Sequence, residues 1–483
     1  MRILEARKHP IVYTNGQSEC LTMIEAIIDR TVERFKTVVL DVDGSPKKKE
    51  DYFNEEFILA GFAGTGKTTI AENILNYAKH KGINTIVLAP TNKACNVLRT
   101  KLKNIEVNTL HSMLYGTPDD TFGQEWTLSA KIAKSLILVD ESSMVSTDLY
   151  NDIKEAAEYG NIIIFMGDSF QLEPVGKNPE LFERINYELT EVKRQVNDSP
   201  ILKIATVIRT MRNIFVYEDD ESDTYCLYDT KNALIREYIK YVRDNKDAIF
   251  IVDTNKERTA INNKVREHLA YDDIIVNNER LISIANSSIY ANGETFTINN
   301  IIEVKKLDFE IPQFKGSLKV KGAFVKAIDA NDNTNVYLLV VDYDQPTLYH
   351  QTITKMLEED KEDKYQFRKI FGQLALRPNK KNDDYGLNSL LNSAHNKNKP
   401  AQFSKSITIV TYGYAISAHK SQGSQWEHIF INQVWAKPTW SIERWFYTAL
   451  TRSSKTLHLS RENQALNFKS NDKINKKYEQ ITQ

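Results

Sequence analysis

The sequence predicts an α/β protein with two cores, each built on a parallel sheet that helices cover on both faces. Short apolar runs, such as residues 162–166 and 248–252, contain no alternating polar residues. This pattern is typical of strands that are buried on both faces of a parallel sheet. Helical or loop segments separate the runs, which fall into two groups, one on each side of about residue 180. The two groups predict two separate sheets.

Each predicted sheet has four such runs. The runs of the first core are residues 57–60, 85–89, 136–139 and 162–166, and those of the second core are residues 248–252, 407–410, 429–431 and 457–459.

A long excursion interrupts the second core. The turn signal Asn292-Gly293 and β-rich runs at 295–298 and 336–341 favour a small inserted barrel. Charged and Asn/Lys-rich stretches follow, so we expect an excursion of helices and loops after the barrel. The predicted domains are 1–180 (first core, with an insertion at about 112–134), 181–284 (first part of the second core), 285–345 (barrel), 346–405 (helical excursion) and 406–483 (last part of the second core, with a polar tail).

Composition excludes several classes of protein. The 483 residues are 41% hydrophobic and 10% aromatic, which excludes a wholly disordered chain. Three widely spaced cysteines exclude a disulfide scaffold and indicate a reducing compartment, and no Cys/His cluster indicates a zinc site. Lys and Arg number 63 against 64 Asp and Glu, which excludes a globally basic nucleic-acid coat but leaves room for a local basic groove. Without a leader or an apolar run of about 20 residues, we expect a soluble cytoplasmic protein with no membrane partner.

A phosphate-binding loop is the most specific motif. Residues 61–68 read GFAGTGKT and fit the pattern GxxxxGK[ST], between a predicted strand and a predicted helix. Glycines let backbone N–H groups wrap around phosphate oxygens, and the helix N-terminus adds positive potential. Lys67 can then reach the β- and γ-phosphates of a nucleotide, and the Thr68 hydroxyl can bind Mg²⁺. The expected cofactors are therefore ATP and Mg²⁺.

Two acids end the apolar run at 136–139. Asp140 can make a second Mg²⁺ contact, and Glu141 can activate a water molecule. Many strands end in an acid, but this strand follows a phosphate-binding loop. A nucleotide kinase needs no water-activating acid at this position, so Glu141 favours hydrolysis.

Two further motifs point to the γ-phosphate. Residues 167–175 follow a buried strand and bring Asp168 and Gln171 to its end, where a γ-phosphate could be sensed. Arg452 lies in the second core, and an arginine supplied across a cleft stabilises the charge that develops in phosphoryl transfer. Taken alone, such motifs are more often a simple turn and an exposed helix arginine.

The order of these motifs resembles that of the superfamily 1 DNA helicases, and most closely the RecD-like 5′-to-3′ branch with its Dda-like phage members. The resemblance runs from Asn15 to about Arg452. It implies an α/β fold with two RecA-like P-loop cores, a small SH3-like β-barrel insertion and a hairpin pin insertion. The helical excursion resembles the tower or hook of Dda-like proteins.

The resemblance also implies the site residues. The implied catalytic residues are Lys67, Asp140, Glu141, Gln171, Arg194 and Arg452. The implied ATP-binding residues are Gln17 (on adenine), Gly61, Ala63, Gly64, Thr65, Gly66, Lys67, Thr68, Thr69, Gln171, Arg194, Gly423 and Arg452, with Thr68 and Asp140 as metal ligands. The implied DNA-binding residues are Pro90, Thr91, Asn92, Thr109, His111, Asn255 and His419.

Two positions qualify these assignments. Gln425 stands where related helicases often carry a Glu that contacts ribose, so we expect a weaker ribose contact. In the implied pin, Phe122 and Trp126 are the candidates for separating strands, because aromatic side chains stack on bases. The alternative is that both rings only pack the hairpin onto the core.

The expected function is an ATP-dependent, DNA-stimulated helicase that translocates 5′ to 3′ on single-stranded DNA and separates duplex strands in phage replication, recombination or repair. The expected partners are single-stranded DNA, a duplex fork and a single-strand-binding or other replication protein. The expected state is a monomer, in the host cytoplasm if a phage encodes it.

Three alternatives remain at this point. One is a translocase that displaces bound proteins with little unwinding. Another is a nucleotide-regulated DNA-binding or scaffold module, against which Lys67, Glu141 and Arg452 argue. The third is a nucleotide kinase, against which the two predicted cores argue.

Overall fold

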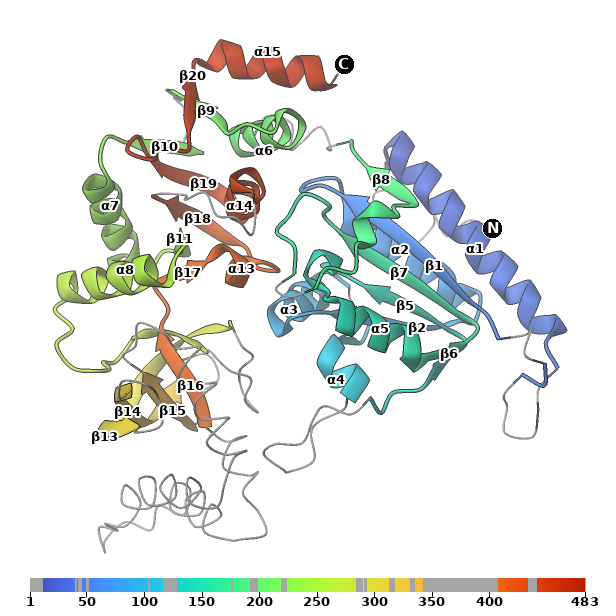
Figure 1. Ribbon diagram of the computed structural model, residues 1–483, viewed down its shortest axis with the longest axis horizontal. Coiled ribbons are helices and arrows are strands. Elements are labelled where there is room, and N and C mark those ends of the chain that lie inside the picture. Colours follow the sequence, from blue (N-terminus) through green and yellow to red (C-terminus); the bar gives the residue numbers. More distant parts are fainter. Residues whose placement is uncertain are drawn as a thin grey trace, which may run out of the picture.

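The structure is a computed structural model that describes most of the two cores and a β-barrel beneath the second core (Figure 1). The predicted pin residues 116–127 and the predicted excursion at 346–405 lie outside the described residues. The described residues are 12–39, 41, 46–48, 52–102, 105–115, 128–174, 177–191, 199–218, 224–283, 290, 293–311, 318–330, 335–341, 407–432 and 441–482.

The first core contains a six-stranded sheet in the order β3-β2-β5-β7-β1-β8. Every neighbouring pair is parallel, as the apolar runs predict. Its strands are β1 (Asn54–Gly61), β2 (Asn84–Ala89), β3 (Val107–Thr109), β5 (Ser135–Val139), β7 (Asn161–Gly167) and β8 (Tyr187–Leu189).

Alternate residues of the central strands face two helical layers. In β1, Phe57 and Leu59 pack with helices α1, α2 and α3, whereas Ile58 packs with α4 and α5. Both faces are therefore apolar, which explains why the runs show no polar alternation. These helices are α1 (Asn15–Thr37), α2 (Lys67–His80), α3 (Asn92–Lys101), α4 (Leu110–Tyr115) and α5 (Thr147–Ala156), and two short strands, β4 (Ile132–Ala133) and β6 (Ala157–Tyr159), pair beside the sheet.

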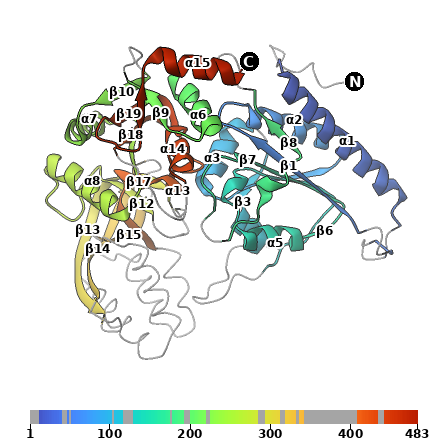
Figure 2. The ribbon, with the colours of Figure 1, turned by 45° about the horizontal axis from the view of Figure 1, so that its top comes forward.

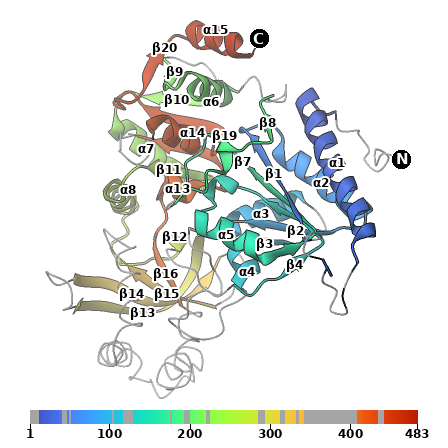
Figure 3. The ribbon, with the colours of Figure 1, turned by 45° about the vertical axis from the view of Figure 1, so that its right-hand side comes forward.

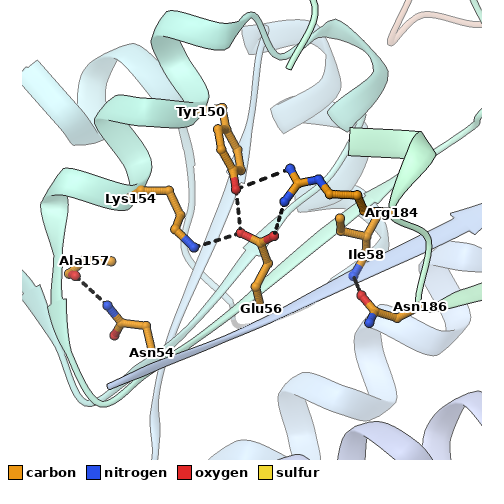
Figure 4. A network of polar contacts seen from close by, with 8 residues as sticks. All are labelled: Asn54, Glu56, Ile58, Tyr150, Lys154, Ala157, Arg184 and Asn186. Atoms are coloured by element: carbon orange, nitrogen blue, oxygen red, sulfur yellow. Dashed lines mark hydrogen bonds and ion pairs between the residues drawn. The ribbon is translucent and has the colours of Figure 1, made fainter. Parts of the chain in front are cut away.

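Glu56 of β1 joins three segments of the first core (Figure 4). Its carboxylate accepts hydrogen bonds from Tyr150 and Lys154 of α5, both at 2.9 Å. Arg184, which follows the short 3-10 helix η3 (Leu181–Glu183), donates to the same carboxylate at 3.3 Å. Asn186 accepts a hydrogen bond from the backbone N–H of Ile58 at 2.7 Å. These contacts tie α5 and the segment before β8 to the strand that leads into the phosphate-binding loop.

The second core contains a five-stranded parallel sheet in the order β10-β19-β18-β11-β17. Helices α7 and α8 cover one face, and α6 and α14 cover the other. The strands are β10 (Tyr225–Tyr228), β11 (Ala248–Val252), β17 (Ala415–Ser417), β18 (Trp426–Ile431) and β19 (Ser453–Ser460), and the helices are α6 (Pro200–Met211), α7 (Lys231–Arg243), α8 (Asn255–His268) and α14 (Ile442–Leu450).

The C-terminal segment folds back over α6 (Figure 2). Strand β20 (Asn467–Lys469) pairs with β9 (Phe215–Tyr217), and helix α15 (Asn471–Thr482) packs on α6. None of the described helices is both long enough and apolar enough to span a bilayer.

A closed five-stranded barrel interrupts the second core and lies beneath α8 (Figure 3). Its buried side chains belong to the same apolar cluster as α7 and α8, so its interior continues into the core. The strands are β12 (Arg280–Ser283), β13 (Thr295–Ile311), β14 (Leu318–Asp329), β15 (Asn335–Val341) and β16 (Ile407–Tyr412).

One predicted strand belongs to a different sheet. The apolar run at 407–410 forms part of β16, which pairs with β12 and β15 of the barrel, not with the second core. The core strand at this point is β17, which pairs with β11. The prediction was wrong because a short run of β-branched residues suits any buried strand and does not specify its neighbours. Only Gly413 and Tyr414 separate β16 from β17.

Candidate active site

The phosphate-binding loop joins β1 to α2 in the first core. Gly64 and Gly66 both have φ of 82°, a left-handed conformation that glycine adopts at little steric cost. Gly66 is the N-cap of α2 and provides no side-chain hydrogen bond to the helix. The first N–H groups of α2 are thus left to a ligand, and the helix N-terminus favours an anion there.

Two side chains, Lys67 and Gln17, donate hydrogen bonds to carbonyl groups of this loop. Lys67 donates from Nζ to the carbonyl oxygens of Gly61 at 2.5 Å and Phe62 at 3.2 Å. Gln17 is fully buried and donates from Nε2 to the carbonyl of Thr65 at 2.7 Å. The other end of the Gln17 amide accepts from the N–H of Thr14 at 3.1 Å. In this structure Gln17 therefore holds the loop, and its adenine contact stays a prediction.

A cavity of about 530 Å³ lies over the loop, a volume typical of small-molecule sites. It brings together predicted residues from five separate segments of both cores. Gly61, Thr65 and Gln17 are not part of its lining. The predicted residues that line it are Ala63, Gly64, Gly66, Lys67, Thr68, Thr69, Asp140, Glu141 and Gln171 from the first core, and Gly423 and Arg452 from the second.

The acidic pair lies where β5 ends. Glu141 has a φ of 51°, the left-handed region that costs energy for a residue with a Cβ. Burial and the neighbouring charge of Glu141 raise the pKa of the Asp140 carboxyl, while Lys67 opposes the shift. A divalent cation would stabilise the ionised carboxylate.

Thr68 and Asp140 fit a magnesium site, because a hydroxyl and a carboxylate are hard oxygen donors. Magnesium keeps several water ligands and needs only one or two protein carboxylates together with substrate phosphates. No group of three or more His, Cys, Asp or Glu with metal-site geometry occurs among the described residues.

Gln171 is 5% exposed and lines the cavity. Its Oε1 atom has no hydrogen-bond partner among the described residues. Buried polar atoms are nearly always satisfied, so an open acceptor in a cavity points to a ligand or a water molecule that it would bind.

Arg452 reaches the same cavity from the second core. It is 6% exposed, and its guanidinium donates to the carbonyls of Thr448 at 3.1 Å and Ser424 at 3.4 Å. These bonds orient the guanidinium on its own core, at the edge of the cavity.

Residues of the second core form hydrogen bonds with the loop that carries Gln171. Leu172 donates its N–H to the Thr448 hydroxyl at 2.9 Å, and its carbonyl accepts from Gln422 at 2.9 Å. Arg444 donates to the carbonyl of Gln171 at 3.1 Å. Residues of α14 and of the segment before Gly423 therefore hold this first-core loop through its backbone.

The predicted DNA-binding residues lie where parallel strands end and helices begin. Thr91 caps α3 after β2, and the Thr109 hydroxyl accepts from the N–H of Ser112 at the start of α4 after β3. Asn255 opens α8 after β11, and His419 lies in α13 (Ala418–Ser421) after β17. Pro90 and Asn92 flank Thr91, and His111 lies in α4. None of these residues lines the cavity. Because β2 is paired with β3 and β11 with β17, they make up a second region that lies at neighbouring strand ends on each core.

Three cations in this second region were not singled out from the sequence. Lys93 follows Asn92, and burial lowers its pKa to about 8. Lys420 follows His419, and burial together with the charge of Arg258 lowers its pKa to about 8. Arg258 lies one turn after Asn255 in α8, and burial lowers its pKa too. The sequence signal that could have identified them is their position next to predicted DNA-binding residues.

Arg194, Phe122 and Trp126 lie outside the described residues. Their predicted roles stay predictions.

Two family models match stretches of the chain that contain Lys67 and Arg452. Residues 54–218 match the model of an AAA domain, and residues 412–460 match that of a UvrD-like helicase C-terminal domain. An uncharacterised protein of Acanthamoeba polyphaga mimivirus, R530, is 25% identical over 78% of this chain and 88% of its own length.

Two named helicases are similar over shorter stretches. The ATP-dependent DNA helicase dda of Enterobacteria phage T4 is 26% identical over 59% of this chain and 62% of its own length. The ATP-dependent RecD2 DNA helicase of Deinococcus radiodurans is 29% identical over 31% of this chain and 21% of its own length. Among solved structures, that of the Bacteroides Pif1 helicase with ADP-AlF3 and ssDNA matches at 17% identity and a TM-score of 0.44, and it covers 98% of each chain.

Proposed function

Because the chain is related to the superfamily 1 helicases of the RecD-like branch and is an enzyme of the ATP-dependent DNA helicase class, we propose that it translocates 5′ to 3′ on single-stranded DNA and separates duplex strands. The observation that carries the proposal is the cavity shared by Lys67, Glu141 and Arg452 of two cores. A protein that only binds a nucleotide on one core would need no arginine from a second core.

We assign each group in the cavity a step of ATP hydrolysis. Lys67 and the N–H groups of α2 bind the β- and γ-phosphates. Glu141 takes the proton of the attacking water, and the open Oε1 of Gln171 orients that water. Arg452, together with Arg194, stabilises the charge that develops on the γ-phosphate. Thr68 and Asp140 would hold Mg²⁺, which neutralises phosphate charge when bound.

Two grips on DNA are proposed, one on each core. Helix N-termini attract phosphate groups, and α3 offers one on the first core while α8 offers one on the second. Closing of the cleft on ATP would shift one grip relative to the other, and opening after hydrolysis would complete a step. The 5′-to-3′ direction rests on the relation to the RecD-like branch alone.

Finer assignments complete the proposal. The barrel of β12 to β16 is proposed to correspond to the SH3-like insertion of this branch, and the segment with Phe122 and Trp126 to its pin. We propose that the protein works as a monomer at a duplex fork in phage DNA replication, recombination or repair, with a single-strand-binding or other replication protein as partner.

The deciding experiment offers two partial duplexes, one with a 5′ overhang and one with a 3′ overhang, together with ATP and Mg²⁺. We expect unwinding of the 5′-overhang substrate alone, and none by Lys67→Ala. Displacement of streptavidin from a biotinylated strand without duplex unwinding would establish the translocase alternative. Unwinding from the 3′ overhang alone would overturn the direction.

A further inference from the structure

The hydroxyl of Tyr447 in the second core contacts two loops of the first core. It donates to Oδ2 of Asp168 at 2.7 Å and accepts from the backbone N–H of Ala63 at 3.3 Å. Ala63 belongs to the phosphate-binding loop, and Asp168 directly follows β7. One side chain of α14 therefore joins the loop that lies beneath the cavity to the loop that carries Gln171.

Tyr447 is 1% exposed, and Asp168 is also 1% exposed. Burial and the charge of Asp168 raise the pKa of the Tyr447 phenol well above its usual value, so the hydroxyl keeps its proton and can donate. The other oxygen of Asp168 accepts from the N–H of Phe170 at 3.0 Å. The Tyr447 hydroxyl is thus the second-core donor to a buried carboxylate of the first core.

The ring of Tyr447 packs independently of its hydroxyl. It meets the Phe170 ring edge to face at 5.1 Å between centroids. Phe62, Phe170 and Leu172 of the first core share one apolar cluster with Tyr447 and the second core. Removal of the hydroxyl alone would leave this apolar contact in place.

The same helix also positions Arg452. Thr448, the next residue, accepts from the N–H of Leu172 through its hydroxyl and from Arg452 Nε through its carbonyl. The position of α14 against Ala63 and Asp168 therefore fixes where the Arg452 guanidinium lies relative to the phosphate-binding loop.

We propose that Tyr447 is a positioning residue for ATP hydrolysis, whose hydroxyl holds α14 on Ala63 and Asp168 and so sets Arg452 over the closed cleft. This inference rests on the proposed function. Tyr447 is not among the residues that line the cavity, so it acts through its partners. Without the hydroxyl, closure would leave a buried carboxylate oxygen of Asp168 unsatisfied, which penalises the closed state and not the binding of either ligand.

The test compares Tyr447→Phe with the matched control Tyr225→Phe. Tyr225 is a buried tyrosine of the second core whose hydroxyl donates to the Tyr217 carbonyl at 2.8 Å, within that core. At saturating single-stranded DNA, we expect kcat of ATP hydrolysis to fall about tenfold or more in Tyr447→Phe. The KM for ATP, the Kd for DNA and the melting temperature should stay close to wild type, and Tyr225→Phe should keep its kcat.

Asp168 gives an independent second pair of variants. Asp168→Ala should lower kcat to a similar extent. The double variant with Tyr447→Phe should have a kcat no lower than that of the more impaired single variant, because both substitutions remove the same contact. Asp168→Asn keeps an acceptor for the Tyr447 hydroxyl, so its kcat should be much closer to wild type than that of Asp168→Ala.

Three outcomes would overturn the inference while wild type remains active. These are an unchanged kcat in Tyr447→Phe, an equal loss in Tyr225→Phe, or a loss confined to the KM for ATP. A wild-type protein with no ATPase would instead overturn the proposed function, and this inference with it.

Discussion

The ammonium group of Lys93 lies 3.8 Å from the centre of the Trp426 ring, so a helix of the first core meets a strand of the second in a cation–π contact. Nearby, a Cβ placed on Gly423 would come within 3.1 Å of the Cβ of Ala94. The segment that carries the predicted DNA contacts Thr91 and Asn92 thus touches the segment that lines the ATP cavity through Gly423. The two proposed sites meet at this contact.

Loss of the Lys93 charge should weaken closure of the two cores. A desolvated cation–π pair is worth about 2 kcal/mol, so we expect Lys93→Met to lower DNA-stimulated ATPase about 3- to 30-fold. Lys93→Arg should stay near wild type, because arginine also stacks on aromatic rings. Lys81→Met removes a cation 5.0 Å from the Tyr77 ring within the first core and serves as the control. A defect in DNA affinity alone would show that Lys93 acts on DNA and not on closure.

Glu141→Gln should bind ATP but turn it over at least about 10²-fold more slowly, because a general base is typically worth 10²–10⁴. The amide keeps the size of the side chain at this left-handed position, so the fold should be retained. Single-turnover ATPase and nucleotide binding measure the two effects separately. Lost ATP binding with an intact kcat would make Glu141 a binding residue.

Acid should destabilise the second core through His458. This fully buried ring stacks on Phe430 at 3.9 Å, and its Nδ1 lies 3.1 Å from the Tyr228 hydroxyl. Burial, His428 and Lys246 lower the pKa of His458 to about 3, against about 6.5 in an unfolded chain. The folded state therefore binds fewer protons. The contribution of neutral His458 to the free energy of unfolding is complete above about pH 6.5. It falls by up to about 1.4 kcal/mol per pH unit as the pH drops towards 3.

Urea unfolding at pH 7.5 and pH 4.5 measures this effect. The free energy of unfolding should fall less with acid in His458→Phe than in wild type, while the exposed His80→Gln should retain the wild-type slope. Equal slopes for wild type and His458→Phe would show that folding does not lower the pKa of His458.

Phe122→Ala should cut unwinding about 5- to 150-fold while DNA-stimulated ATPase stays near wild type, since base stacking is worth about 1–3 kcal/mol. Trp126→Ala should lower both activities more evenly, because a Trp at the base of a hairpin more often packs on the core. Thermal melting controls for lost stability in both variants. Normal unwinding of a 5′-overhang duplex by Phe122→Ala would exclude Phe122 as the wedge.

Local sequence patterns predicted many of the strands and motifs of this protein, but they did not predict its long-range contacts. The parallel sheet of the first core followed from runs without polar alternation, and Lys67, Asp140 and Glu141 from motifs that each fit within a few residues. The barrel pairing of residues 407–410 could not be predicted, because an apolar run does not identify its neighbour. The contacts of Tyr447 with Ala63 and Asp168 join positions more than 250 residues apart, and nothing in their local sequence indicates the pairing.

The short link between β16 and β17 couples the barrel closely to the second-core segment that carries the predicted DNA contact His419. A Cβ on Gly413 would lie 2.8 Å from the backbone carbonyl of Leu281, so the link is pressed against the first barrel strand. Two residues beyond β17, the chain reaches His419 in α13. A force applied to the barrel would therefore be transmitted through this short link to α13, because only two residues separate the barrel strand β16 from β17.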